Sequence, residues 1–254
     1  MHSARKPKIV TIIPARLAST RFPGKIIAPL AGKPLVLHAY ERACRAELVS
    51  ETVIATDSLE VLDKLESYGA RVMLTDADHQ TGTDRVAEAA AGSGADIVVN
   101  VQGDEPLIDP HTIDEAVRAL LDDPEAVMAT AKRRLTGPEA IRDPNIVKVV
   151  CDERGRALYF SRSPIPYVRD GGLADGEYWQ HIGLYAYRLD FLLAFANMAQ
   201  TPLEKQEKLE QLRALENGYP IAVVETAYES IGVDTPEDLE RVNALFTTSK
   251  EELR

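Results

Sequence analysis

The sequence predicts an α/β fold in which a mainly parallel central sheet is flanked by helices. Short runs of β-branched residues alternate with longer helical patterns, as in repeated βαβ units. Four of the five residues at 97–101 are apolar, which is typical of a central strand that is covered on both faces. A chain of 254 residues with 45% hydrophobic residues is long enough to build such a sheet.

Strand and helix patterns alternate along the first half of the chain, and local signals mark some of their ends. Ser58 is a candidate N-cap for the second helix, and Gly69 marks the end of that helix. Pro110 suits the N-terminus of a later helix. In order, the predicted elements are a strand at 9–13, a helix at 35–45, a strand at 52–56, a helix at 59–68, a strand at 71–74, a helix at 85–91, a strand at 97–101, a helix at 113–121 and a strand at 127–131.

The regular alternation of strand and helix patterns ends in the second half of the chain. Residues 146–150 and 157–160 read as a hairpin, and a long loop rich in Pro and Gly follows it. We therefore expect one domain over residues 1–254, with an excursion near 145–180 that packs against a second subunit. The remaining predicted elements are a strand at 182–187, helices at 191–198 and 203–215, a strand at 221–224 and a last helix from residue 236.

Composition and charge narrow the classes of partner. With 29 Lys and Arg residues against 40 Asp and Glu residues, the formal net charge is -11, which disfavours nucleic-acid binding. Cys44 and Cys151 belong to no C-x-x-C pair, so we expect two reduced core cysteines rather than a zinc site or a disulfide. No apolar stretch is long enough for a signal peptide or a membrane span, so we expect a cytoplasmic protein without a membrane partner.

The most basic part of the chain surrounds the end of the first predicted strand. Residues 1–45 carry nine basic side chains and one acidic side chain, and the long connection at 14–25 holds three of the basic ones. In an open α/β sheet, ligands bind at the carboxyl ends of the strands, where this loop must lie. The loop matches neither the P-loop pattern nor G-x-G-x-x-G, so a P-loop kinase and a dinucleotide dehydrogenase lose their main support.

The polar side chains of this loop have the chemistry to surround a triphosphate. Guanidinium groups make bidentate contacts with phosphate, an ammonium group acts as a point charge, and hydroxyl groups donate hydrogen bonds. The alternative is a set of solvated surface cations, which is what most Arg and Lys residues are. The residues concerned are Arg16, Ser19, Thr20, Arg21 and Lys25.

Two aspartates far apart in the chain are candidate ligands for Mg²⁺. Asp104 follows the central strand after Gly103, although an aspartate at this position also suits a turn. Asp234 precedes Thr235, which is a good N-cap for a helix that begins at Pro236, so Asp234 is not needed as the cap. Mg²⁺ is usually held by one or two carboxylates together with substrate phosphates. These aspartates and the basic loop suggest Mg²⁺-assisted transfer to or from a nucleoside triphosphate.

A sugar pocket is suggested by one later strand. His181, Tyr185 and Tyr187 alternate on one face of that strand, although a lone strand histidine is more often a core or surface residue. Glu210 and Gln211 interrupt the apolar positions of a predicted helix, and their pattern alone indicates a solvated helix edge.

Five motifs can be read together: IIPARLASTRFPGK at 12–25, DHQTGTDR at 78–85, VNVQGDEP at 99–106, ALYFSR at 157–162 and GVDTPEDLE at 232–240. Together they closely resemble the 3-deoxy-manno-octulosonate cytidylyltransferase family, in the same order from about residue 9 to residue 242. The resemblance is weakest before Lys8 and at residues 164–178. It implies a GT-A-like nucleotidyltransferase fold, dependence on Mg²⁺ and a homodimer.

The resemblance also implies roles for individual residues. Arg16, Lys25, Asp104 and Asp234 would carry catalysis, and the two aspartates would hold Mg²⁺. The nucleotide-binding residues that it implies are Ala15, Arg16, Ser19, Arg21, Lys25, Thr81, Gly82, Arg85 and Asp104. The residues that it implies for the sugar acid are Gln102, His181, Tyr185, Glu210 and Gln211.

The reaction implied is attack by the anomeric hydroxyl of 3-deoxy-D-manno-octulosonate (Kdo) on the α-phosphorus of CTP. The products are CMP-Kdo, a precursor for lipopolysaccharide synthesis, and pyrophosphate. One rival is transfer to a related sugar acid such as 8-amino-Kdo, because one polar group in a pocket can change specificity strongly. A rival of another class is a non-catalytic nucleotide-binding module, against which both aspartates and the complete basic loop argue.

Overall fold

The chain folds into two compact units, which are described in turn. The structure is a computed structural model that describes residues 5–18, 22–173, 176–229 and 231–251. The first unit comprises Met1–Ile113 and Ser230–Arg254, and the second comprises Asp114–Glu229. The first unit is therefore discontinuous in sequence, because it takes its last segment from the end of the chain.

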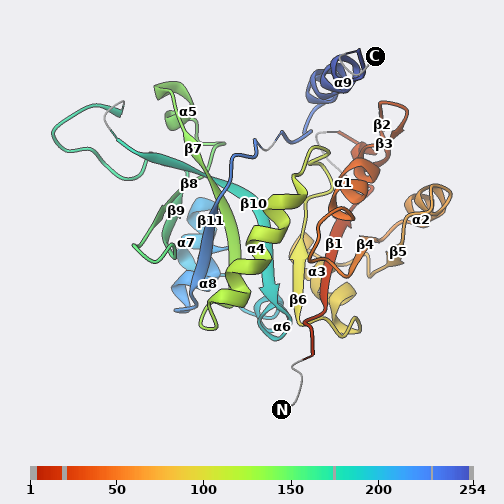
Figure 1. The fold of residues 1–254 in the computed structure, drawn as a ribbon, viewed down its shortest axis with the longest axis horizontal. Helices are drawn as coiled ribbons and strands as arrows, with labels where there is room; N and C mark the ends of the chain where they lie inside the picture. Colours follow the sequence, from red (N-terminus) through yellow and green to blue (C-terminus); the bar gives the residue numbers. More distant parts are fainter. Residues whose placement is uncertain (1–4, 19–21, 174–175, 230, 252–254) are drawn as a thin grey trace. The chain divides into compact units, whose positions relative to one another are not determined.

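Parallel strands form the centre of the first unit (Figure 1). In spatial order they are β6 (Ile97–Asn100), β1 (Ile9–Ala15), β4 (Glu51–Thr56) and β5 (Val72–Leu74). Every pairing between these neighbours is parallel. All residues of β6 are buried, as the apolar run predicted for a strand that is covered on both faces. The parallel α/β arrangement expected from the sequence is thus confirmed.

Helices and a short hairpin complete the first unit. Ser58 caps its helix as predicted, because its hydroxyl accepts a hydrogen bond from the amide of Val61 at 3.3 Å. The helix after Thr81 begins three residues earlier than predicted, because Thr81 and Asp84 form a capping box. The elements are η1 (Lys25–Ile27), β2 (Pro29–Leu30), β3 (Lys33–Pro34), α1 (Leu35–Ala43), α2 (Leu59–Glu66), α3 (Gly82–Ala91), the start of α4 (Pro110–Asp122), and α9 (Pro236–Glu251).

The second unit is built on a mixed sheet. Its strands are β7 (Met128–Leu135), β8 (Lys148–Cys151), β9 (Ala157–Ser161), β10 (Tyr178–Arg188) and β11 (Ile221–Glu225). β7 pairs antiparallel with β10 and parallel with β11. β8 pairs antiparallel with both β9 and β10, so the predicted hairpin is confirmed. The pairing of β10 with β7 shifts register between Ile182 and Tyr185, which marks a bulge in β10.

The helices of the second unit correct one prediction. They are α5 (Pro138–Arg142), α6 (Leu189–Ala196), α7 (Pro202–Glu207) and α8 (Leu212–Glu216). The single helix expected at 203–215 is wrong, because Lys208 has a left-handed backbone with φ of 55° and ends α7. This break places Glu210 and Gln211 in the turn before α8.

The cysteines are free thiols, but neither has the core position that the sequence suggested. Cys44 is exposed because it follows the last residue of α1, and Cys151 is half-buried at the end of β8. Burial raises the pKa of the Cys151 thiol. Within the described ranges, none of the helices has both the length and the apolar character that crossing a bilayer requires.

Candidate active site

An ammonium group and two carboxylates meet in the first unit. Lys25 Nζ lies 2.7 Å from Asp104 Oδ2 and 3.1 Å from Asp234 Oδ1. Lys25 is only 8% exposed as a residue, although it is charged. The structure therefore brings together three of the four side chains to which the sequence assigned catalysis.

The backbone explains how residues so far apart in sequence converge. The amide of Val233 donates a hydrogen bond of 2.9 Å to the carbonyl oxygen of Asp104, which joins the segment before α9 to the loop after β6. Thr235 acts as the N-cap, as predicted, because its hydroxyl accepts a hydrogen bond from the Asp238 amide at 3.2 Å. The Asp234 carboxylate is not used as the cap and instead accepts a hydrogen bond from Lys25.

Gly103 lets the loop after β6 pack closely against its neighbours. A Cβ atom at this position would lie 3.1 Å from the carbonyl oxygen of Pro14 and 3.2 Å from side-chain carbons of Ile26 and Val36. These distances are tighter than ordinary van der Waals contact, so a side chain here would push the loop away from β1. Glycine thus sets the position of Asp104.

Electrostatics keep Lys25 charged in this cluster. Burial by itself lowers the pKa of Lys25, but the carboxylates of Asp104 and Asp234 raise it by more, so the pKa lies above its usual value. The ammonium group is thus a cation on which two carboxylate oxygens converge. Carboxylate oxygens are the ligands that Mg²⁺ prefers, so the donor set fits this metal.

The cluster would not complete a metal site by itself. In the part of the chain that the structure describes, no group of three or more His, Cys, Asp or Glu side chains is placed to hold an ion. A cation bound by Asp104 and Asp234 would need further oxygens from water or from substrate phosphates. That requirement agrees with the way in which Mg²⁺ is held by enzymes that act on nucleoside triphosphates.

Arg16 links the basic loop to the segment that precedes α3. Its guanidinium group donates hydrogen bonds to the carbonyl oxygens of His79 at 2.6 Å and Gln80 at 3.2 Å. These residues lead directly to Thr81 and Gly82 at the start of α3. The structure therefore brings Arg16 together with the segment that the resemblance assigns to the cytosine and ribose side.

Arg85 joins two strand ends through its guanidinium group. It is fully buried, and its guanidinium group contacts Asp57 at 2.7 Å and the hydroxyl of Thr75. Asp57 and Thr75 directly follow the carboxyl ends of β4 and β5. We therefore expect Arg85 to support the nucleotide side by holding these two strand ends in place.

Two further predicted residues of the first unit, Ala15 and Gln102, lie near strand ends. Ala15 is the last residue of β1 and is fully buried. Gln102 is half-buried in the loop between β6 and Asp104. Ser19, Thr20 and Arg21, which the sequence placed around the triphosphate, lie outside the described residues.

Aromatic rings surround His181 in the second unit. The ring of His181 lies 5.0 Å from that of Phe160 and 5.4 Å from that of Tyr185, measured between centroids. Tyr185 is in turn 5.9 Å from Tyr187, so the predicted face of β10 exists. Burial lowers the pKa of His181 to about 3, which keeps the imidazole neutral at physiological pH.

Glu210 and Gln211 extend this group of side chains. Burial raises the pKa of Tyr185, and the negative charge of Glu210 raises it further, so the two side chains lie within electrostatic reach. Gln211 is only 3% exposed, and its Nε2 atom has no hydrogen-bond partner. A buried amide without a partner is costly, so it suits a site where a ligand supplies the acceptor. Helical periodicity missed both residues because it did not indicate the break after Lys208.

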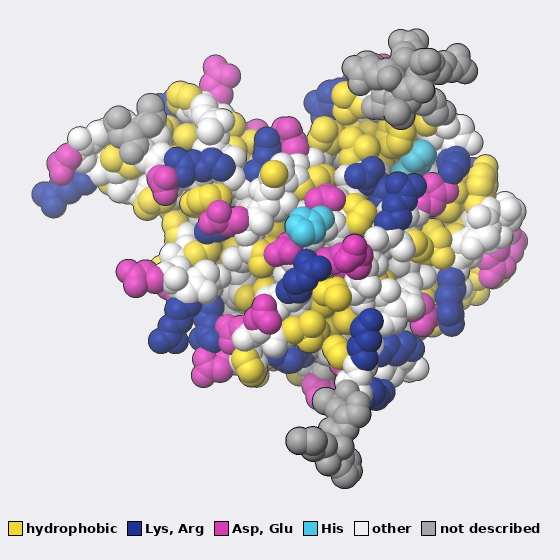
Figure 2. Space-filling view, in the orientation of Figure 1, with side chains coloured by type: hydrophobic (Ala, Val, Ile, Leu, Met, Phe, Trp, Pro, Cys, Tyr) yellow, Lys and Arg dark blue, Asp and Glu magenta, His cyan; other side chains and the backbone are white. Residues whose placement is uncertain are grey.

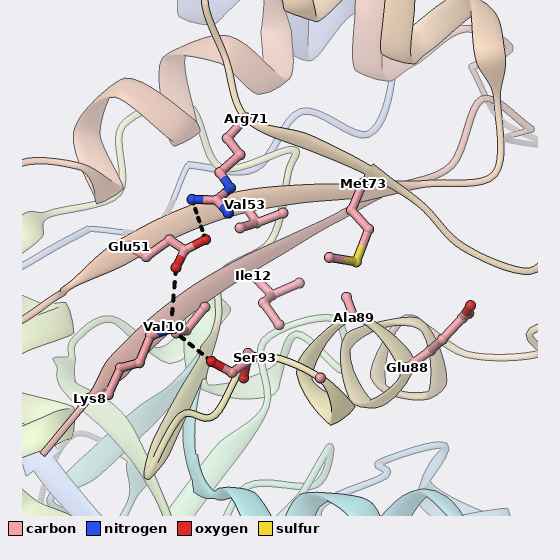
Figure 3. A pocket seen from close by; sticks show the side chains of 11 residues that line it. Lys8, Val10, Ile12, Glu51, Val53, Arg71, Met73, Glu88, Ala89 and Ser93 are labelled. Atoms are coloured by element: carbon pink, nitrogen blue, oxygen red, sulfur yellow. Dashed lines mark hydrogen bonds and ion pairs between the residues drawn. The ribbon is translucent and has the colours of Figure 1, made fainter.

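A cavity of ≈ 410 Å³ lies elsewhere in the first unit (Figure 3). Glu51 at the start of β4 forms ion pairs with Lys8 at 3.5 Å and with Arg71 at 2.7 Å. Lys8 Nζ also donates to the Ser93 carbonyl oxygen at 2.7 Å. These groups mark the amino-terminal ends of the strands, whereas the candidate site lies at their carboxyl ends. The cavity is therefore separate from the predicted chemistry.

Charged side chains of both signs are mixed on the face drawn in Figure 2. Figure 2 shows Lys and Arg side chains interspersed with Asp and Glu side chains over the face drawn. An extended nucleic acid would favour a continuous basic surface, which this face does not present.

Comparisons with known proteins agree with the geometry. The family model for cytidylyltransferases matches residues 10–231. A 3-deoxy-manno-octulosonate cytidylyltransferase of Solibacter usitatus is 57% identical over 242 residues, which cover 95% of this chain and 96% of the relative. The enzyme of the same name from Geobacter metallireducens is 57% identical over 244 residues, which cover 92% of this chain and 96% of the relative.

A solved structure extends the likeness to three dimensions. It is a CMP:2-keto-3-deoxy-manno-octonic acid synthetase complexed with CTP, and it matches with a TM-score of 0.91 at 41% identity. The match covers 95% of this chain and 99% of that one. Since sequence and fold agree over almost the whole length, and the predicted carboxylates and lysine meet as the motifs require, this chain belongs to the 3-deoxy-manno-octulosonate cytidylyltransferase family.

Proposed function

We propose that this protein transfers CMP from CTP to the anomeric hydroxyl of Kdo. The hydroxyl oxygen attacks the α-phosphorus of CTP, the bond between the α-phosphorus and the bridging oxygen breaks, and pyrophosphate leaves. The product, CMP-Kdo, serves lipopolysaccharide synthesis. The observation that carries the proposal is the convergence of Lys25, Asp104 and Asp234 in a chain of this family.

Electrostatic repulsion is the main obstacle to this reaction, because both substrates are anions and the leaving group is a polyanion. Lys25 supplies a fixed positive charge, and the carboxylates of Asp104 and Asp234 hold its side chain in place. A well-placed charge contact of this kind contributes roughly 3 kcal/mol to stabilisation of the transition state. Arg16 supplies a second cation beside the nucleotide segment.

We propose that Asp104 and Asp234 also hold Mg²⁺, because two carboxylates that face one cation match the donors that this metal takes. When bound, the metal supplies charge neutralisation on the triphosphate. The rest of the nucleotide side orients CTP. We assign this role to Ala15, Arg16, Ser19, Arg21, Lys25, Thr81, Gly82, Arg85 and Asp104.

The sugar acid is assigned to a second set of residues. We propose that Gln102, His181, Tyr185, Glu210 and Gln211 contact Kdo. The neutral imidazole and the unpartnered amide of Gln211 support this assignment, because a sugar offers hydroxyl groups that both donate and accept hydrogen bonds.

We further propose that the enzyme forms a homodimer through the excursion near residues 145–180. Two large apolar side chains in this region are solvent-exposed in the single chain: Leu158 is 62% exposed and Tyr167 is 87% exposed. Exposed apolar side chains mark candidate contact surfaces. We propose a cytoplasmic location, because nucleoside triphosphates are supplied there.

The test is a pyrophosphate-release assay on the purified protein. CTP, ATP, GTP and UTP are each supplied with Kdo, with 8-amino-Kdo and without a sugar, in Mg²⁺ and in EDTA. We expect release only in Mg²⁺, fastest with CTP and Kdo, and with one CMP-Kdo formed per pyrophosphate. Faster transfer to 8-amino-Kdo would change the assigned substrate. Stoichiometric CTP binding without release would indicate a non-catalytic module.

A further inference from the structure

The hydroxyl of Thr130 lies at the centre of a buried polar cluster in the second unit. Thr130 belongs to β7 and is fully buried. Its Oγ1 atom lies 2.9 Å from Nε2 of His181, 3.0 Å from the carbonyl oxygen of Ile182 and 2.8 Å from that of Leu184. One hydroxyl group thus lies within hydrogen-bond distance of three groups on β10.

The bulge in β10 explains why these neighbours face a side chain. Ile182 lies opposite Ala131, whereas Tyr185 lies opposite Thr130, so β10 carries extra residues between these two pairs. A bulge disrupts the ladder of hydrogen bonds between strands. The Thr130 hydroxyl therefore faces carbonyl oxygens that the regular ladder would otherwise satisfy.

Counting protons decides the direction of the bond to His181. A hydroxyl group has one proton to donate and two lone pairs to accept with, whereas a carbonyl oxygen can only accept. If Nε2 were also an acceptor, three acceptors within 3.0 Å would compete for one proton. The Thr130 proton is instead directed to the carbonyl oxygens, and Nε2–H of His181 donates to Oγ1.

The second ring nitrogen is then fixed as well. Burial lowers the pKa of His181 to about 3, so the imidazole carries a single N–H at neutral pH. With that proton on Nε2, Nδ1 is an acceptor. Among the described residues Nδ1 has no hydrogen-bond partner, and His181 as a residue is 8% exposed.

We infer that Thr130 is a positioning residue for the sugar acid: its hydroxyl holds His181 as the Nε2–H tautomer, so that Nδ1 accepts a hydrogen bond from a hydroxyl group of the sugar. The inference rests on the proposed function for the identity of the ligand. The tautomer itself depends only on the geometry around Thr130. Thr130 acts through His181 and touches no substrate atom itself.

The matched variants are Thr130→Val, which keeps the shape but removes the hydroxyl, and Thr130→Ser, which keeps the hydroxyl. The first measurement is a long-range ¹H–¹⁵N correlation spectrum of ¹⁵N-histidine-labelled full-length protein at pH 7 without ligand. The chain has five histidines, and the His181 signals are assigned by their loss in His181→Gln.

We expect wild type and Thr130→Ser to show a protonated Nε2 and an unprotonated Nδ1 at His181. Thr130→Val should lose this preference and show Nδ1–H or a mixture. A wild-type His181 protonated on Nδ1 would overturn the inference, as would a Thr130→Val protein with the wild-type tautomer. Thr130→Val can fail to fold because it leaves two buried carbonyl oxygens without a hydrogen-bond donor. The wild-type and Thr130→Ser spectra still decide the tautomer in that case.

The second measurement is steady-state kinetics with CTP and Kdo varied separately. Losing one neutral hydrogen bond should raise KM for Kdo about three- to tenfold in Thr130→Val, with KM for CTP unchanged and Thr130→Ser close to wild type. An altered tautomer with an unchanged KM for Kdo would refute the positioning role. If wild type transfers no CMP to Kdo, the proposed function fails, while the spectra still report on Thr130.

Discussion

Lys25 Nζ lies 2.7 Å from Asp104 Oδ2, so the buried lysine of the basic loop is already paired with a carboxylate. A second carboxylate, that of Asp234, lies 3.1 Å from the same nitrogen. The ammonium group thus stands where a metal cation bound by the two aspartates would compete for the same oxygens.

Asp104→Asn or Asp234→Asn should lower kcat by at least about a hundredfold, because each removes a charged oxygen from the proposed metal site. Pyrophosphate release at saturating Mg²⁺ measures this. Circular dichroism should show a folded protein. Asp96→Asn is the matched control, because Asp96 lies just before the amino end of β6, away from Asp104, and it should keep wild-type activity. Near-normal release from either site variant would refute the metal assignment.

Lys25→Ala should raise KM for CTP more than KM for Kdo, because it removes a cation that we assign to the triphosphate. It should also leave Asp104 and Asp234 without their counter-charge, so Mg²⁺ should raise the melting temperature of the variant more than that of wild type. Differential scanning fluorimetry with and without Mg²⁺ measures this difference. Equal shifts in both proteins would show that Lys25 and the metal do not share these carboxylates.

Asp57→Asn should destabilise the protein by about 3–5 kcal/mol, because it leaves the fully buried Arg85 guanidinium without its ion-pair partner. Urea unfolding at pH 7 measures the free energy of unfolding. Glu41→Gln breaks the Lys33–Glu41 pair, whose side chains are 43% and 37% exposed, and it should cost less than about 1 kcal/mol. Equal losses of unfolding free energy in the two variants would contradict the argument that burial makes the Asp57–Arg85 pair more important for stability than the Lys33–Glu41 pair.

The Glu204–Arg213 pair should make stability depend on acid pH. Burial by itself raises the pKa of Glu204, but the hydrogen bonds from Arg213 and from the Thr201 amide, together with the positive charges of Arg213 and Lys205, lower it by more in sum. The folded pKa therefore lies below the unfolded value of 4.5. The contribution of this carboxylate is therefore complete above about pH 4.5 and is lost as the pH falls through the folded pKa.

Urea unfolding of wild type and Glu204→Gln between pH 7 and pH 3 measures this contribution. The difference in free energy of unfolding should be about 3–5 kcal/mol at pH 7 and should narrow below pH 4.5. Glu240→Gln, which changes an exposed residue of α9, should have the same free energy of unfolding as wild type at every pH. A difference between wild type and Glu204→Gln that stays constant with pH would argue against a charged pair.

Local patterns predicted much of the fold and the positions of the two aspartates that we assign to the metal. The apolar run at 97–101 predicted β6 and hence the position of Asp104 at its carboxyl end, because burial on both faces is visible in composition alone. Thr235 and Pro236 predicted the start of α9, and with it an Asp234 that faces away from the cap. Each of these predictions depended on a few neighbouring residues.

What the sequence did not reveal depends on contacts between distant residues. A left-handed backbone is usually marked by glycine, but the residue that adopts it here is Lys208. Nothing in the local sequence therefore predicted the turn that places Glu210 and Gln211 before α8. Arg85 reads as a helix residue, and only the folded strand ends show that it pairs with Asp57. The Thr130–His181 contact requires the register of β7 against β10, which periodicity cannot supply.

The hydrogen bond from Val233 to Asp104 has a consequence for how the enzyme is made. A nascent chain in which the segment around Asp234 is still inside the ribosomal exit tunnel contains Asp104 and Lys25 but cannot yet place Asp234 beside them. The cluster of Lys25, Asp104 and Asp234 can therefore form only after residue 234 has been synthesised, and a fragment of the first 113 residues would lack it.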